Sequence, residues 1–206
     1  KAIRVAFGPP NNLTPWRYHD QFIRWCYDEP QRARDALLEL WGSGDAVDRL
    51  QQFSVLLPES VAKGPGVRAT IAAFLLLADD VYDNPMYRPM VLNRAYQLAG
   101  HRSLSPLSNP ARRYSLALAF FDRIVEATRE MDVPIANRLE AQSVVWRMVT
   151  GKEGPADWNT EDWNAFRKFR SRVIRESDED DDGSDDDETD LYGTDPNNSD
   201  SDGDGI

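Results

Sequence analysis

The sequence predicts an all-α globular domain of seven or eight helices, followed by an irregular C-terminal acidic repeat. Apolar residues recur at spacings of three and four through residues 1–175, and capping residues, prolines and glycines stand at the ends of those stretches. No stretch alternates apolar and polar residues with a period of two, as a half-buried strand would. With 41% apolar residues in 206, the chain can build one hydrophobic core of ordinary size.

The first two predicted helices have clear starts. Thr14 is expected to cap the first helix, with Pro15 at its first position. The second spans residues 30–41 and stops at Gly42. The residues expected to share a face are Trp16, Ile23, Cys26 and Tyr27 in the first helix and Ala33, Ala36, Leu37, Leu40 and Trp41 in the second.

A third helix is expected after Asp45, its predicted cap, and is closed by Pro58. Residues 67–78 are apolar almost all round, which predicts a central helix covered by the others. Residues 64–66, Gly-Pro-Gly, are expected to connect two helices, and residues 82–89 to form a loop.

Four more helices are expected further along the chain. Their ends are predicted from glycine and proline residues and from Asn or Thr at capping positions. They are residues 90–99 ending at Gly100, a long helix after Asn109 and Pro110 whose apolar stripe runs from Tyr114 to Thr128, residues 135–149, and a last helix capped by Thr160.

Charge divides the chain into two parts. Residues 1–175 hold all twenty-four basic residues and twenty acidic ones, a net charge of +4. Residues 176–206 hold fifteen acidic residues and no basic one, and so account for the overall charge of -11. Such a shift indicates a module boundary near Glu176, between a helical domain (1–175) and an aspartate-rich segment (176–206).

The acidic segment contains a D-x-D-x-D-G unit twice, at residues 178–183 and 200–205. Alternate carboxylates can project to one side of a curled loop, while the glycine permits the sharp turn that closes oxygens around a cation. Because the segment has no His or Cys, its donors favour a hard ion, and the loose, carboxylate-rich geometry favours Ca²⁺ over Mg²⁺. The alternative is a solvated acidic tail that binds cations only diffusely.

Residues 178–206 resemble the thrombospondin type 3 repeat, particularly in the connector from Leu191 to Pro196 and the loop that follows. The resemblance implies a truncated calcium-binding repeat with almost no hydrophobic core. The first unit lacks the apolar residue expected directly after Gly183. The ligands that the resemblance and the repeat pattern imply are Asp178, Asp180, Asp182, Asp185 and Glu188 for the first ion and Asp200, Asp202 and Asp204 for the second.

Arginine outnumbers lysine twenty to four, and its forked guanidinium suits phosphate. The densest basic patches are therefore candidates for contact with nucleic acid, although the same arginines could pair with acids on neighbouring helix turns. These candidates are Arg112, Arg113, Arg167, Lys168, Arg170, Arg172 and Arg175.

No motif of an active site is present in the helical part, so we expect a domain that is not an enzyme. His19 and His101 have no His or Cys at ligand spacing, and Cys26 lies among aromatic residues, so structural or surface roles are expected for all three. The pair Asp79 and Asp80 is the one arrangement that could serve acid–base chemistry, and a solvated helix end is the simpler interpretation.

Residues 32–170 look like a helical region found upstream of the motor in some McrB-like restriction ATPases. The segments that carry this resemblance are Leu38-Glu39-Leu40-Trp41, Gly64-Pro65-Gly66, Leu75-Leu76-Leu77, Tyr87-Arg88-Pro89 and Asn93-Arg94-Ala95-Tyr96. It implies a role in recognising DNA or in assembling with a motor domain. No phosphate-binding loop is present, so ATP hydrolysis is not implied for these residues.

The leading hypothesis is a non-catalytic helical interaction domain of a restriction-type system, joined to a calcium-binding repeat. The alternative is an extracellular or cell-surface adhesion protein with calcium-stabilised repeats. The first implies a cytoplasmic location and the second does not, so the sequence leaves the compartment open. No apolar run reaches the roughly 20 residues of a membrane span. A start without Met and an end inside a repeat predict a fragment of a longer protein.

Overall fold

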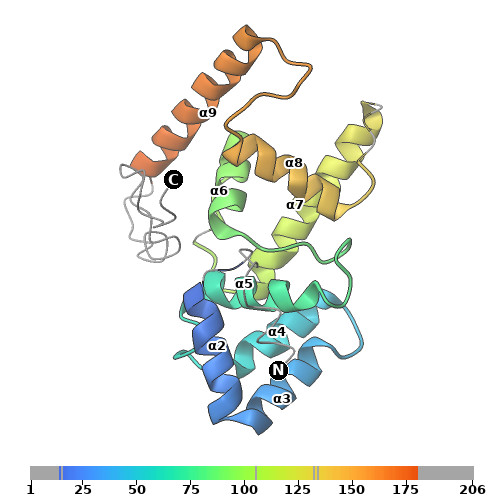
Figure 1. Cartoon of the computed structure of the whole chain (residues 1–206), viewed down its shortest axis with the longest axis vertical. Coiled ribbons are helices and arrows are strands. Elements are labelled where there is room, and N and C mark those ends of the chain that lie inside the picture. The colour runs from blue at the N-terminus through green and yellow to red at the C-terminus, as the bar shows by residue number, and fades with distance from the viewer. Residues whose placement is uncertain (1–13, 15, 105, 132, 134, 181–206) are drawn as a thin grey trace.

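The computed structural model describes residues 14, 16–104, 106–131, 133 and 135–180, with the backbone only at Trp16 and residues 176–180. Eight α-helices and no strand occur in these residues, which confirms the all-α prediction for the helical part. The helices, shown in Figure 1, are α2 (Trp16–Asp28), α3 (Pro30–Leu40), α4 (Ala46–Leu56), α5 (Gly64–Leu76), α6 (Pro89–Leu98), α7 (Pro110–Glu130), α8 (Arg138–Thr150) and α9 (Thr160–Asp180).

The helices form two groups joined by the long helix α7. Helices α2, α3, α4 and α5 pack in succession at one end, and α6, α8 and α9 lie at the other (Figure 1). Helix α7 contacts α4 and α5 in the first group and α8 in the second. One hydrophobic core, with buried residues from α2 through α8, therefore runs through both groups.

Helix α5 is the centre of the first group, as its apolar composition predicted. Ten of its residues are buried, and its only buried hydroxyl, that of Thr70, donates to the carbonyl of Gly66. The indole nitrogen of Trp41 donates to the carbonyl of Leu75 at 3.0 Å, which ties the end of α3 to the end of α5. The Gly-Pro-Gly turn of residues 64–66 is in fact the first turn of α5, because proline is well accommodated at the start of a helix.

Predicted caps are confirmed at two helices and wrong at one. The Asp45 carboxylate accepts from the amides of Val47 and Asp48, and the Asn109 side chain accepts from the amide of Arg112. At α9 the cap is Asn159 and not Thr160, because Thr160 is already helical and its predecessor reaches the amide of Asp162 at 2.8 Å.

The predicted face of α2 is rotated by about one residue. Phe22 and Trp25 are the fully buried pair, Ile23 and Cys26 only partly cover the core, and Tyr27 is 66% exposed. Burial raises the pKa of the Cys26 thiol, as expected for a small residue at the edge of a core. In the part of the chain that the structure describes, no helix has the length and apolar character that crossing a membrane requires.

Candidate nucleic-acid interface

The basic residues singled out in the sequence separate into buried and exposed groups. Arg113 is buried and Arg170 is partly covered. The remaining five are exposed: Arg112, Arg167, Lys168, Arg172 and Arg175.

Arg113, one of the candidates for contact with nucleic acid, is buried between α5 and α7. Only 7% of the residue is exposed, and its Nε donates to the carbonyl of Leu107 at 2.6 Å. A Cβ added to Gly66 would lie 3.1 Å from the Arg113 guanidinium. The lack of a side chain at Gly66 therefore lets α5 approach α7 closely at this point. Burial raises the pKa of the neighbouring Tyr87 to about 12, and Arg113 offsets part of that rise. Arg113 is therefore a core arginine.

Arg170 fastens α9 to the end of α8. One of its Nη atoms donates to the carbonyls of Met148 and Gly151, at 2.9 and 3.1 Å. Its guanidinium also lies over the rings of Trp163 and Phe166, 5.7 and 5.8 Å from their centroids. Burial lowers the pKa of Arg170, and the nearby Arg167 adds to this effect. The side chain is occupied by the fold and is not free to bind phosphate.

Lys168, Arg172 and Arg175 form a basic stripe along the outer face of α9. Their spacing of four and three residues places them on one side of a helix. Trp163 and Phe166, which are partly buried, lie on the opposite side with Arg170. None of the three basic residues of this stripe forms an ion pair with a side chain that the structure describes. The α9 stripe therefore presents positive charge to solvent.

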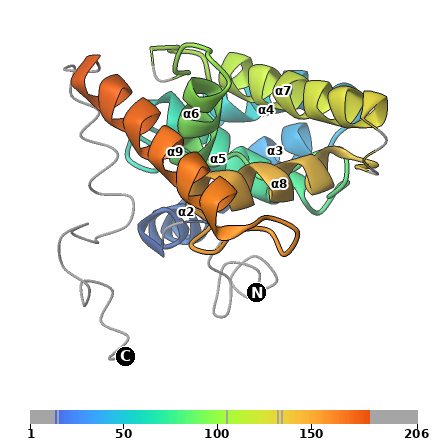
Figure 2. The same cartoon turned by 90° about the horizontal axis from the view of Figure 1, so that it is seen from above.

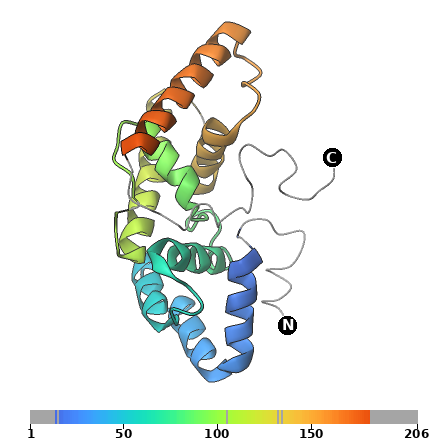
Figure 3. The same ribbon diagram turned by 90° about the vertical axis from the view of Figure 1, so that its left-hand side faces the viewer.

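A pocket of about 560 Å³ lies between the end of α6, the segment that follows it and the middle of α7. Its lining includes the aromatic, basic and apolar side chains of Tyr96, His101, Arg102, Leu116, Phe120 and Arg123. None of the described residues that line it carries a carboxylate. The segment following α6 and the C-terminal end of α9 lie on the same side of the molecule, to the left in Figure 3 and at the top in Figure 2.

Backbone geometry holds the wall and rim of this pocket in place. Gly100 adopts a φ of 75°, and the next amide, that of His101, donates to the carbonyl of Tyr96 at 2.8 Å. This is the Schellman pattern that ends helices at a glycine, and it turns His101 toward the pocket. The Asn93 side chain accepts from the amide of Leu104 at 3.1 Å, so the segment is also tied to the middle of α6.

Aromatic rings form one wall of the pocket. The rings of Tyr96 and Phe120 lie 4.7 Å apart, and the His101 ring lies 5.7 Å from Tyr96. The Tyr96 hydroxyl donates to the carbonyl of Leu116 at 2.7 Å, which fixes its ring against α7. Burial raises the pKa of Tyr96, and the nearby Arg112 offsets part of that rise.

Sequence reasoning missed this pocket. It gave His101 a structural or surface role and did not single out Arg102 or Arg123. A signal was present, since Arg112, Leu116, Ala119 and Arg123 share one face of the predicted long helix.

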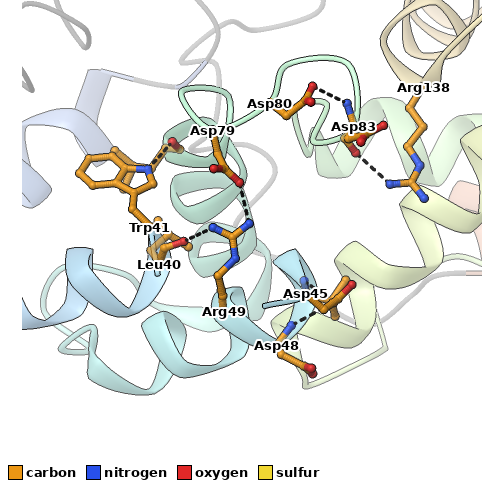
Figure 4. A network of polar contacts seen from close by, with 11 residues as sticks. Leu40, Trp41, Asp45, Asp48, Arg49, Asp79, Asp80, Asp83 and Arg138 are labelled. Carbon is orange, nitrogen blue, oxygen red and sulfur yellow. Dashed lines mark hydrogen bonds and ion pairs between the residues drawn. The ribbon is translucent and has the colours of Figure 1, made fainter. Parts of the chain in front are cut away.

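The carboxylates that could have served acid–base chemistry have structural partners. Asp79 pairs with Arg49 at 2.6 Å, and the Asp80 carboxylate accepts from the amides of Tyr82 and Asp83, which closes the turn after α5 (Figure 4). The carbonyl of Asp83 in turn accepts from Arg138 (Figure 4). His19 is buried and stacks on Phe74 of α5, in keeping with a structural role.

The predicted calcium ligands lie outside the described side chains. Helix α9 continues to Asp180, so the backbone of Asp178 and Asp180 belongs to its last turn. Within the described residues no three His, Cys, Asp or Glu side chains gather as they would around a metal ion. The ligands wholly outside the described residues are Asp182, Asp185, Glu188, Asp200, Asp202 and Asp204.

The chain matches no protein-family description, no curated protein and no solved structure.

Proposed function

We propose that this helical domain is a non-catalytic recognition module that binds DNA through the α9 stripe. The observation that carries the proposal is the exposure of Lys168, Arg172 and Arg175 on one face of α9, with no ion-pair partner among the described side chains. Cations that are not neutralised within the protein can displace the counterions of a phosphate backbone, which is the main source of affinity for nucleic acid.

The anchoring of α9 supports the same proposal. Its inner face packs against α6 and is held to the end of α8 by Arg170. The rings of Trp158, Trp163 and Phe166 pack together there, with centroids 5.6 to 6.3 Å apart. A helix fastened on one face presents the opposite face in a fixed orientation, which lowers the entropy lost when a partner binds.

The proposed setting is a restriction-type assembly in which a motor domain is a further partner. This setting rests on the resemblance of residues 32–170 to the region upstream of McrB-like motors. The acidic repeat that follows is proposed to bind calcium ions and to act as a calcium-stabilised spacer. Its donors are all oxygens, and fifteen negative charges in residues 176–206 repel one another until a cation is bound.

The second candidate is an extracellular or cell-surface adhesion protein in which the helices bind another macromolecule. The observation that favours it is the repeated D-x-D-x-D-G unit with its connector, because the repeat that it resembles is usually extracellular. In that case the α9 stripe would not bind DNA.

A salt titration of DNA binding tests the leading proposal. Fluorescence anisotropy with plain and base-modified duplexes should show binding at about 50 mM salt that weakens steeply by about 200 mM. A triple variant, Lys168→Gln, Arg172→Gln and Arg175→Gln, should bind at least about tenfold more weakly. It should also reduce the slope of log K against log salt by about 3, one unit for each lost phosphate contact.

The matched control removes three exposed basic residues elsewhere, all arginines, and so changes the net charge equally. Arg24, Arg32 and Arg34 lie on α2 and α3, and each pairs with a neighbouring carboxylate. Their replacement by Gln should leave binding within about twofold of the unmodified protein. Equal loss in both triple variants, or no binding at low salt, would reject the α9 stripe as the interface.

A further inference from the structure

The pocket between α6 and α7 combines an aromatic surface with positive charge. An apolar ligand would use only the first of these elements, and a bare anion only the second. One is the aromatic wall of Tyr96 and Phe120, and the other is a basic rim of His101, Arg102 and Arg123. Its volume of about 560 Å³ falls within the range of roughly 300–1,000 Å³ that small-molecule sites occupy.

The wall suits a planar ring. Tyr96 is 9% exposed and backs Phe120, which is half-buried and lines the pocket. Any base can stack on such a ring, because every base has a π-face. The Tyr96 hydroxyl donates to a carbonyl of α7, which holds this wall of the pocket against that helix.

The rim suits a phosphate. Arg102 and Arg123 approach the pocket from the segment after α6 and from α7, and His101 stands beside the wall. Neither arginine forms an ion pair with a described side chain, and the described lining contains no carboxylate to repel an anion. Charge-assisted hydrogen bonds from guanidinium groups to phosphate are about twice as strong as neutral ones.

We infer that this pocket binds a nucleoside phosphate, with the base on the aromatic wall and the phosphate on the basic rim. The inference goes beyond the proposed function, because it concerns α6 and α7 and does not depend on whether the α9 stripe binds DNA. The nucleoside phosphate has two possible sources, a free mononucleotide or an unstacked nucleotide of a single strand.

Calorimetric titration with adenosine 5′-monophosphate, adenosine and inorganic phosphate tests the combination of wall and rim. The mononucleotide should bind at least about tenfold more tightly than either fragment, since only it uses both elements. Binding of phosphate as tight as that of the mononucleotide would reduce the site to an anion site. If adenosine bound as tightly as the mononucleotide, the basic rim would contribute nothing to binding. Either result, or no binding of the mononucleotide, overturns the inference.

Variants assign the site to this pocket. Arg123→Gln should weaken mononucleotide binding at least about tenfold, whereas Arg129→Gln, an exposed arginine near the end of the same helix, should leave it unchanged. Glu126→Gln removes a carboxylate one turn from Arg123 and should strengthen binding slightly. Equal effects of Arg123→Gln and Arg129→Gln would place the nucleotide elsewhere, with circular dichroism confirming that both variants are folded.

A short single-stranded oligonucleotide separates the two sources. If the pocket takes a nucleotide within a strand, Arg123→Gln should weaken oligonucleotide binding by the same factor as mononucleotide binding. If it takes only a free nucleotide, the oligonucleotide should not compete with the mononucleotide. The triple variant of the α9 stripe should leave mononucleotide binding intact in both cases, so failure of the DNA proposal remains distinguishable from failure of this one.

Discussion

Arg49 shows how one buried charge links three helices. Its side chain is 9% exposed and donates to the carbonyl of Leu40 at 2.8 Å and to the carboxylate of Asp79 at 2.6 Å (Figure 4). Leu40 ends α3, Arg49 lies in α4, and Asp79 follows α5. A buried guanidinium is stabilised only while these oxygens remain in place.

Replacing Arg49 with Met should destabilise the domain by about 2–3 kcal/mol. The carbonyl of Leu40 would lose a buried donor and Asp79 its cation, while the methionine conserves most of the packing. The midpoint of urea unfolding, followed by tryptophan fluorescence, measures the change.

The control for Arg49 is Asp79→Asn, which keeps an oxygen acceptor. Asp79 is 40% exposed, so this change should cost about 1 kcal/mol or less. If Arg49→Met proved as mild as Asp79→Asn, the contact with Leu40 would contribute nothing measurable.

Arg112 and Arg113 show how far the sequence distinguishes an exposed arginine from a buried one. Both were assigned to a nucleic-acid face because they are adjacent arginines. Arg113 stands four residues before Ala117 and eight before Phe121, which are both buried, so its place on the core side of α7 could have been predicted from spacing. Its approach to Gly66 could not, because α5 is distant from α7 in the sequence.

At the scale of elements, α9 packs against α6 and is joined to the end of α8. Its attachment to α8 relies on Arg170, which satisfies carbonyls at the C-terminal end of that helix. The last carbonyls of an α-helix have no partner within the helix, so a donor from outside is needed there. The two hydrogen bonds of Arg170 should therefore stabilise the contact between α8 and α9.

Replacing Arg170 with Met should loosen α9 without unfolding the domain. Loss of two hydrogen bonds and of the contacts with Trp163 and Phe166 should make the amides of α9 exchange about tenfold faster, which corresponds to about 1.4 kcal/mol. Hydrogen exchange measured by mass spectrometry reports this helix by helix.

The control on the same helix is Arg167→Met, which removes an exposed arginine. Exchange in α9 should be unchanged in this variant, and exchange in α4 and α5 unchanged in both. Equal acceleration by the two variants would show that Arg170 does not anchor the helix.

At the scale of the whole molecule, the charge asymmetry of the chain governs the acidic repeat. The carboxylates of residues 176–206 repel one another, and a divalent ion that several of them share removes that repulsion. Because α9 includes Asp178 and Asp180, a calcium loop that begins at residue 178 requires the last turn of α9 to leave the helical conformation.

Calcium should therefore bind to the intact chain with measurable heat, and Mg²⁺ at the same concentration should not order the repeat. Asp180→Ala and Asp202→Ala should each reduce the calorimetric uptake, because each removes a carboxylate from one of the two D-x-D-x-D-G units. Asp20→Ala, on the exposed face of α2, is the control and should leave uptake unchanged. If calcium produced no heat of binding with the intact chain, the acidic segment would be a solvated tail and not a calcium-binding repeat.

The sequence by itself determined the helices, most of their ends and the central place of α5. These depend on neighbours within a few residues: apolar spacing, capping side chains, prolines and glycines. Only the tertiary structure decided that Arg170 bonds to the end of α8 and that Tyr96, Phe120 and Arg123 share a pocket. The reason is physical, since burial and site geometry arise where helices distant in sequence pack together, and the rotation of each helix is set by its partners as well as by its own pattern.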